Sequence, residues 1–346
     1  MSGAQPADGE ATTPRISIVV PTYNRARVLA RLLRALERQT TPAEGFEVIV
    51  VDDGSTDATG SVLAEDYSYR LRALSQANAG PAAARNTGIA CASGEIILFV
   101  DDDVIPRDDL IERHLAAHEG REVVAFGRMC PPAGGRKQPF WAEWELRTLE
   151  QQYAAMLSGA FKPTFRQFFT GNASLCREYL VHAGMFNPAF RRAEDVELGS
   201  RLEALPRDFV FADEAVVYHD TPRTLAGWVM MARQYGHYDA LLSQLPGLGW
   251  LHECLVEELI YSRKRAVRAA VRLFAGRPLV VPVMRRVLPR LLQAVDAVGL
   301  RRLALGGCSL LFPLLYWHEF CRERGGRQCL SLPPASVEAL SPAAVE

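Results

Sequence analysis

The alternation of short apolar runs with amphipathic segments from residue 15 to 118 most constrains how this 346-residue chain can fold. Four β-branched or apolar runs predict strands at 16–20, 46–51, 70–74 and 95–100. Segments with helical spacing follow them at 27–38, 58–64, 81–92 and 108–118. Strands that alternate with helices favour right-handed crossovers, so we expect an α/β fold with a mostly parallel sheet.

Polar residues follow three of these predicted strands. Thr22–Asn24 comes after the first, Asp52–Asp53 ends the second, and Asp101–Asp103 follows the fourth. In an open parallel sheet, ligands bind beyond the carboxyl ends of the strands. We therefore expect the three clusters to line one crevice.

The pattern is less regular after residue 120. Strands are expected at 121–129, on both sides of a turn at Thr170–Asn172, at 208–212 and at 214–218, with helices at 140–157 and 193–205. Beyond Pro222 nearly every segment has helical character. We predict a disordered tail at 1–14, an α/β domain at 15–222 and a helical region at 223–346.

Composition excludes several classes of protein. The 39 basic and 40 acidic side chains leave a net charge of −1, which argues against a nucleic-acid packing protein, so no nucleic-acid partner is expected. Seven cysteines without a CxxC pair argue against a disulfide framework and a zinc ribbon, and favour a reducing compartment. Residues 1–14 lack the basic start and apolar run of a signal peptide, so we expect a cytoplasmic protein.

Seven motifs stand in a characteristic order. They are Pro21-Thr22-Tyr23-Asn24-Arg25, Val51–Asp57, Ala79–Gly88, Phe99–Asp103, Thr170-Gly171-Asn172, Glu194-Asp195 and His219. Over about residues 15 to 220 the chain thereby resembles the family 2 glycosyltransferases. The resemblance implies a GT-A, Rossmann-like sheet flanked by helices, here with a C-terminal helical appendage. It also implies metal-dependent, inverting transfer of a sugar from a nucleotide-diphosphate sugar to an acceptor hydroxyl, in glycan or cell-envelope biosynthesis.

The resemblance also implies which residues bind the donor. Pro21, Thr22, Tyr23, Asn24, Arg25 and Asp53 match its nucleotide-binding positions. Asp53 would accept the N3–H of uracil or thymine, which favours UDP or dTDP; a helix cap is its structural alternative. Asp52 is expected to cap the following turn. Arg85 would grip phosphate or ribose oxygens, and the alternative is a surface salt bridge.

Three adjacent carboxylates repel one another unless a cation offsets them, and hard oxygen ligands favour Mn²⁺ or Mg²⁺. By the resemblance, Asp103 binds the metal, Asp101 contacts metal and ribose, and Asp102 lies near the donor. His219 matches a metal-ligating histidine, and a satisfied polar histidine is the alternative. Asp195 matches the catalytic base, with Glu194 as the fallback and a helix-start cap as the alternative.

Two other functions are alternatives to sugar transfer. A sugar nucleotidyltransferase usually has a glycine-rich loop after its first strand, and Pro21–Arg25 contains no glycine. A non-catalytic nucleotide-sugar-binding protein of the same fold would not need to keep Asp53, Asp101, Asp103 and Asp195 together, because an unused acid cluster is electrostatically unfavourable.

The C-terminal third is strongly basic. Ten arginines and one lysine lie between Arg263 and Arg302 against Asp296 alone, interleaved with leucine and valine. This pattern predicts interfacial helices at 263–320 on an anionic membrane surface, at the inner face of the cell membrane, and favours a lipid-linked acceptor. A helical domain with a solvated basic face is the alternative. The apolar run Leu303–His318 is shorter than the roughly 18–20 residues of a spanning helix.

Overall fold

The computed structural model describes residues 13–131, 138–219, 223–261 and 264–331. They form two compact units. The first comprises the described residues up to 131 and from 150 to 219, and the second comprises 138–149 and those from 223 onward. Residues 1–12 of the predicted tail lie outside the described part of the chain.

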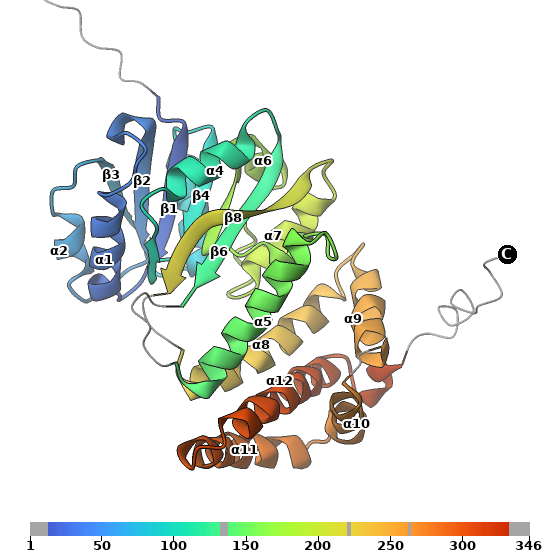
Figure 1. Ribbon diagram of the computed structural model, residues 1–346. Coiled ribbons are helices and arrows are strands. Elements are labelled where there is room, and N and C mark those ends of the chain that lie inside the picture. The colour runs from blue at the N-terminus through green and yellow to red at the C-terminus, as the bar shows by residue number, and fades with distance from the viewer. Residues whose placement is uncertain (1–12, 132–137, 220–222, 262–263, 332–346) are drawn as a thin grey trace, which may run out of the picture. The chain divides into compact units, whose positions relative to one another are not determined.

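The first unit is built on a mixed sheet, whose described strands follow the order β3-β2-β1-β4-β7-β6-β8-β5 (Figure 1). The strands are β1 (Ile16–Thr22), β2 (Phe46–Asp52), β3 (Arg70–Ser75), β4 (Ile96–Val100), β5 (Val104–Pro106), β6 (Val123–Cys130), β7 (Asn172–Cys176) and β8 (Asp208–His219). The first four are the strands predicted before residue 101, and they pair in parallel. Among the described strands only β5 and β7 run antiparallel to their neighbours, so the sheet is mostly parallel, as predicted.

Helices cover both faces of this sheet. The helical elements of the first unit are α1 (Ala26–Leu36), η1 (Ala43–Gly45), α2 (Thr59–Leu63), α3 (Pro81–Cys91), α4 (Leu110–His118), η2 (Phe165–Gln167), α6 (Arg177–His182) and α7 (Glu194–Glu203). The buried leucines of α1 form one apolar cluster with Ile18 of β1 and Ile111 of α4. Gly88 of α3 packs against Val19, whose side chain points to the opposite face because side chains alternate along a strand. The chain thus forms helix, sheet and helix layers, as in other α/β domains.

Two predictions for the middle of the chain are wrong. One strand, β7, begins at Asn172, and residues 168–169, where a strand was expected before the turn, form none. The two strands expected around Asp213 are one strand, β8, whose pairing with β6 shifts between Gly127 and Arg128. The Asn172 Nδ2 donates to the Ala215 carbonyl (2.9 Å) at this irregularity, a contact between residues distant in sequence.

The second unit is helical, as predicted beyond Pro222. Its helices are α8 (Leu225–Leu242), α9 (Gly249–Tyr261), α10 (Arg265–Phe274), α11 (Val280–Ala297), α12 (Arg301–Glu323) and η3 (Arg327–Leu330), while α5 (Phe140–Leu157) contributes residues to both units. Helix α12 packs against α8, where Tyr316 donates to Asp239 Oδ2 (2.6 Å). Trp228 of α8 is fully buried and meets Trp144 edge-on, with ring centroids 5.6 Å apart.

The apolar run Leu303–His318 lies in α12, and most of it belongs to the core of this helical unit. Ala304, Leu305, Cys308, Leu311, Leu314, Leu315 and Trp317 are buried. The expectation that the whole range 263–320 faces a membrane is therefore wrong for this part, because these side chains are already covered by protein.

None of the described helices is both long enough and apolar enough to cross a membrane.

Candidate active site at the strand ends of the first unit

The polar clusters predicted to share a crevice are in contact. Thr22, at the end of β1, is in register with Asp52, at the end of β2, so the two strands end at the same level. The Thr22 hydroxyl donates to Asp102 Oδ2 (2.8 Å) in the loop after β4. The carboxyl ends of β1, β2 and β4 therefore form one polar edge, where an open α/β sheet binds its ligands.

Arg25 binds two of the three carboxylates that follow β4. Its Nη1 donates to Asp102 Oδ1 and to Asp103 Oδ2, each at 2.8 Å. Asp102 is buried, and burial raises its pKa to about 6, although Arg25 and Thr22 act to lower it. Asp102 is thus an internal anchor of the loop, whereas the carboxylate of Asp103 stays partly exposed.

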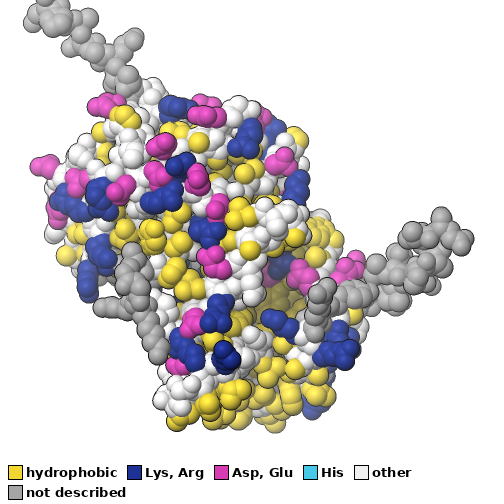
Figure 2. Space-filling view, in the orientation of Figure 1, with side chains coloured by type: hydrophobic (Ala, Val, Ile, Leu, Met, Phe, Trp, Pro, Cys, Tyr) yellow, Lys and Arg dark blue, Asp and Glu magenta, His cyan; other side chains and the backbone are white. Residues whose placement is uncertain are grey.

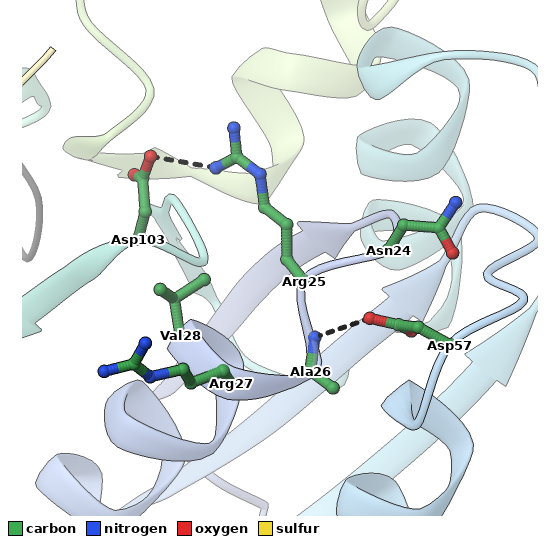
Figure 3. Close-up of a pocket in the computed structure, with 7 residues that line it drawn as sticks. All are labelled: Asn24, Arg25, Ala26, Arg27, Val28, Asp57 and Asp103. Carbon is green, nitrogen blue, oxygen red and sulfur yellow. Dashed lines mark hydrogen bonds and ion pairs between the residues drawn. The ribbon is translucent and has the colours of Figure 1, made fainter. Parts of the chain in front are cut away.

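Arg25 and Asp103 also line a hollow of about 390 Å³ at the start of α1 (Figure 3). Asn24, Ala26, Arg27, Val28 and Asp57 complete its lining. The carboxylate of Asp57 accepts the backbone N–H of Ala26 (3.1 Å) and so satisfies one amide of the helix start. The hollow therefore carries both acidic and basic groups beside the acidic loop.

The remaining residues of the first motif are Pro21, Tyr23 and Asn24. Pro21 lies within β1, and the ring of Tyr23 is about half exposed. Asn24 has a left-handed backbone (φ 53°), which asparagine tolerates better than most residues. Its Oδ1 accepts the backbone N–H of Thr56 (2.7 Å), and its own N–H donates to Ser55 Oγ (2.8 Å). Asn24 thereby ties the loop after β1 to the loop after β2.

Asp52 and Asp53 both support backbone. Asp52 Oδ1 accepts the N–H of Ser55 (2.8 Å), which confirms that it caps the following turn. Asp53 is 4% exposed, and its Oδ1 accepts from Gln76 Nε2 (2.8 Å) and the N–H of Ala79 (2.9 Å). Its Oδ2 accepts only the N–H of Gly80 (2.8 Å) among the described residues, so one lone pair remains on this oxygen.

Arg85 joins the acidic loop to the start of α7. Its Nη2 donates to Asp101 Oδ1 (2.9 Å) and its Nη1 to Glu194 Oε1 (2.7 Å), across 109 residues of sequence. The side chain is only 5% exposed, so the surface salt bridge considered from sequence is not what forms. The guanidinium also lies over the ring of Phe186, 5.6 Å from its centroid, and its Nε has no partner among the described residues.

The carboxyl group of Asp195, at the start of α7, has a raised pKa. Burial and the neighbouring charge of Glu194 raise its pKa to about 7, although Arg85 and the N–H of Val196 act to lower it. A carboxyl group with a pKa near the working pH can both take and release a proton. The residue before this helix, Ala193, has a left-handed backbone (φ 56°), a conformation that is strained for alanine.

Sequence reasoning assigned Thr170-Gly171-Asn172 only a positional role near the acceptor side, and the structure shows what its last two residues contact. A Cβ at Gly171 would lie 2.9 Å from Asp101 Oδ2, so a larger residue there would require this carboxylate to shift. The signal available in the sequence was a glycine between two polar residues directly before a strand.

Asn172 belongs to a buried network that sequence reasoning missed. Its Oδ1 accepts from His114 Nε2 (2.8 Å), and His114 Nδ1 meets Ser174 Oγ (2.7 Å), which also bonds His118 Nε2 (2.8 Å). Since the amide oxygen only accepts, Nε2 of His114 carries the proton. Burial lowers the pKa of both histidines to about 4, so both are neutral at physiological pH. Two histidines four residues apart on one predicted helix were the sequence signal.

The predicted metal ligands are partly brought together. His219 ends β8 and pairs with Val104 of β5, which places it one register step from Asp103. The side chains of Asp101 and Asp103 are partly exposed. Within the described ranges no three His, Cys, Asp or Glu side chains are grouped as a ready metal site, and Arg25 supplies the counter-charge instead. The donor types, two carboxylates and an imidazole, suit Mn²⁺ or Mg²⁺.

Comparisons with known proteins agree on one family. Residues 17–182 match the family model described as Glycosyl transferase family 2. A validoxylamine A glucosyltransferase of Streptomyces hygroscopicus subsp. jinggangensis is 34% identical over 220 residues, which cover 55% of this chain and 52% of that protein. The chain thus spans about half the length of this curated relative.

Solved structures support the same fold. The mannosyltransferase PcManGT from Pyrobaculum calidifontis, in complex with GDP-Man and Mn²⁺, has a TM-score of 0.61 at 22% identity, covering 88% of this chain and 85% of that one. S. aureus TarS 1-349 in complex with UDP-GlcNAc has a TM-score of 0.51 at 20% identity, covering 90% and 92%.

Proposed function

Because the chain contains a family 2 glycosyltransferase domain of the GT-A fold, we propose that it moves a hexosyl or deoxyhexosyl group from a nucleoside-diphosphate sugar to an acceptor hydroxyl with inversion. The observation that carries the proposal is Asp195, whose pKa is raised to about 7 beside the Arg85-linked carboxylates. No other described carboxyl group combines that pKa with a position at the strand-end crevice.

Asp195 takes the proton of the acceptor hydroxyl as its oxygen attacks the anomeric carbon. The new carbon–oxygen bond forms while the bond to the diphosphate breaks, and the nucleoside diphosphate leaves with the electron pair. Attack from the face opposite the leaving group inverts the anomeric configuration. Glu194, held by Arg85, stays beside the base as a fixed negative charge that keeps the Asp195 pKa near neutrality.

In this proposal the nucleotide binds beside the first motif, residues 21–25. The remaining lone pair on Asp53 Oδ2 is the acceptor for a pyrimidine N3–H, and the half-exposed ring of Tyr23 is available to the base. These features favour UDP or dTDP. A guanine nucleotide is the competing donor, because the structurally similar PcManGT is a complex with GDP-Man.

Asp103, Asp101 and His219 are the residues that would hold Mn²⁺ or Mg²⁺. Such an ion, when bound, offsets charge on the diphosphate leaving group. In the absence of a metal ion, Arg25 pairs with Asp103. Because the Arg25 side chain is half exposed, it can adopt another rotamer when a metal ion competes for Asp103.

We infer the chemical class of the acceptor from the helices of the second unit. Its basic, apolar-faced helices favour a lipid-linked or envelope glycan over a small soluble acceptor, and a cytoplasmic site at the inner membrane face.

A thermal-shift panel with UDP, dTDP and GDP, each with and without Mn²⁺, tests the donor site. Asp103→Ala should abolish the part of the stabilisation that depends on Mn²⁺. The nucleotide that stabilises most then defines the donor class for transfer assays. Asp195→Asn should keep this donor-induced shift and lose sugar transfer, and near-normal turnover would rule out Asp195 as the base.

A further inference from the structure

We propose that the exposed face of α11 is a docking surface for a phospholipid membrane that carries anionic head groups. Leu279, just before α11, is 81% exposed. Val283, Val287 and Leu291 follow at intervals of four residues, so they share one side of the helix, and each is more than half exposed. We call these four residues the α11 stripe. Exposed apolar side chains at this spacing are typical of a helix that lies in a membrane interface.

The stripe continues beyond α11 in the second unit. Val298, Leu300 and Leu303, at the end of α11 and the start of α12, are also at least half exposed. Figure 2 shows hydrophobic side chains gathered over α11 and α12 at the bottom of the view, with basic side chains around them. Exposed apolar groups on a globular protein normally occur singly, so a continuous row of them indicates a binding surface.

Basic residues flank the stripe on its exposed side. Arg286 and Arg290 precede Val287 and Leu291 by one position, and both side chains are exposed. Between residues 264 and 302, nine arginines and Lys264 stand against Asp296, which is paired with Arg301. Among the described residues, neither Arg286 nor Arg290 forms an ion pair. Each such side chain near an anionic surface contributes to attraction that decays within about a Debye length.

Charge argues against a second copy of this chain as the occupant. In a symmetric dimer the same patch meets itself, so Arg286 and Arg290 of both copies would come together without an acidic partner in the stripe. Like charges brought together at an interface oppose association. An anionic lipid surface supplies the missing negative charge and an apolar layer at the depth that the leucine and valine side chains reach.

This surface is independent of the proposed transferase chemistry, so its test uses binding rather than activity. The full chain is mixed with vesicles of phosphatidylcholine alone, or with vesicles that also contain phosphatidylglycerol, and the pelleted fraction is measured. We expect binding only to the anionic vesicles, weakened by added salt. The double variant Arg286→Gln/Arg290→Gln should bind roughly thirty-fold more weakly, from about 1 kcal/mol per basic residue.

The apolar part of the stripe has its own variant. Val283→Ser/Leu291→Ser should lower partitioning at least about tenfold, because the two side chains no longer enter the interface. Matched controls change exposed residues of the same types in the first unit. Val181→Ser/Leu157→Ser is the control for the apolar pair, and Arg121→Gln/Arg177→Gln is the control for the basic pair. Melting curves followed by circular dichroism verify that all four variants fold.

Three results would overturn the proposal. They are no binding of the wild-type chain to anionic vesicles, an equal loss of binding in the control variants, and a concentration-dependent dimer that Val283→Ser/Leu291→Ser dissociates. The last outcome would assign the stripe to a contact between copies of the chain.

Discussion

Acidification should destabilise the first unit through His114 and His118, because burial disfavours the charged form of both imidazoles. Burial lowers the pKa of each to about 4 from an ordinary value of 6.5. The unfolded chain therefore binds protons first as the pH falls. The stabilising contribution is complete above pH 6.5, declines below it, and is lost as the pH passes through 4.

The magnitude follows from the pKa difference of about 2.5 units. At about 1.36 kcal/mol per unit, each histidine contributes about 3.4 kcal/mol to the free energy of unfolding, of which roughly 2 kcal/mol is lost by pH 5. Asp102 and Asp195 contribute in the opposite direction, because their pKa values are raised on folding and their protonated forms suit the folded state. A single histidine variant isolates the imidazole contribution, since these acids remain in both proteins.

The assay is urea denaturation at pH 7.5 and pH 5, followed by far-UV circular dichroism. Tryptophan fluorescence is unsuitable, because all five tryptophans, at 141, 144, 228, 250 and 317, belong to the second unit. His118→Gln keeps a donor for Ser174 and removes the titrating ring, so it should lose about 2 kcal/mol less than wild type between the two pH values. His182→Gln, on the exposed α6, is the matched control. An identical pH dependence in His118→Gln and wild type would refute the reasoning.

Three further changes probe the crevice. Gly171→Ala requires Asp101 Oδ2 to shift, so stabilisation by nucleotide and Mn²⁺ should fall in thermal-shift assays; an unchanged thermal shift would contradict a role for the position of this carboxylate. Arg25→Gln removes the group that competes for Asp103, so Mn²⁺ titrated without nucleotide should bind severalfold more tightly, and weaker binding would contradict that competition. Glu194→Gln removes the negative charge beside Asp195, so the pH midpoint of sugar transfer should fall; an unchanged midpoint would count against Asp195 as the titrating base.

Local patterns predicted the first half of the fold well. The runs that became β1, β2 and β4 are buried along their length, so their apolar character is visible without any knowledge of their neighbours. The grouping of the polar residues at the ends of these strands is also predictable, because the carboxyl ends of parallel strands lie at one edge of the sheet. Contact between Thr22 and Asp102 is a consequence of that topology.

The remaining features depend on partners that a local pattern does not contain. Strand β7 enters the sheet between β4 and β6, antiparallel to both, and β8 reaches β5 from more than a hundred residues away. The position of His219 near Asp103 is set by that last pairing. In the same way, a carboxylate at a strand end can face a ligand or hold the next loop, and only the folded chain places Asp53 against Ala79 and Gly80.

Arg85 and Arg25 hold the acidic residues of the crevice in two different ways. Arg85 is buried between Asp101 and Glu194, and removing one partner from such a buried network typically destabilises a protein by about 3–5 kcal/mol. Arg25 is half exposed, and exposed ion pairs contribute only about 0–1 kcal/mol, so its bond to Asp103 is easily exchanged. Asp101 and Glu194, beside the proposed base, are therefore fixed, while Asp103, the other carboxylate proposed for the metal, has a replaceable partner. A transferase needs this division, because the base must stay in position while donor and cation enter and leave in every cycle.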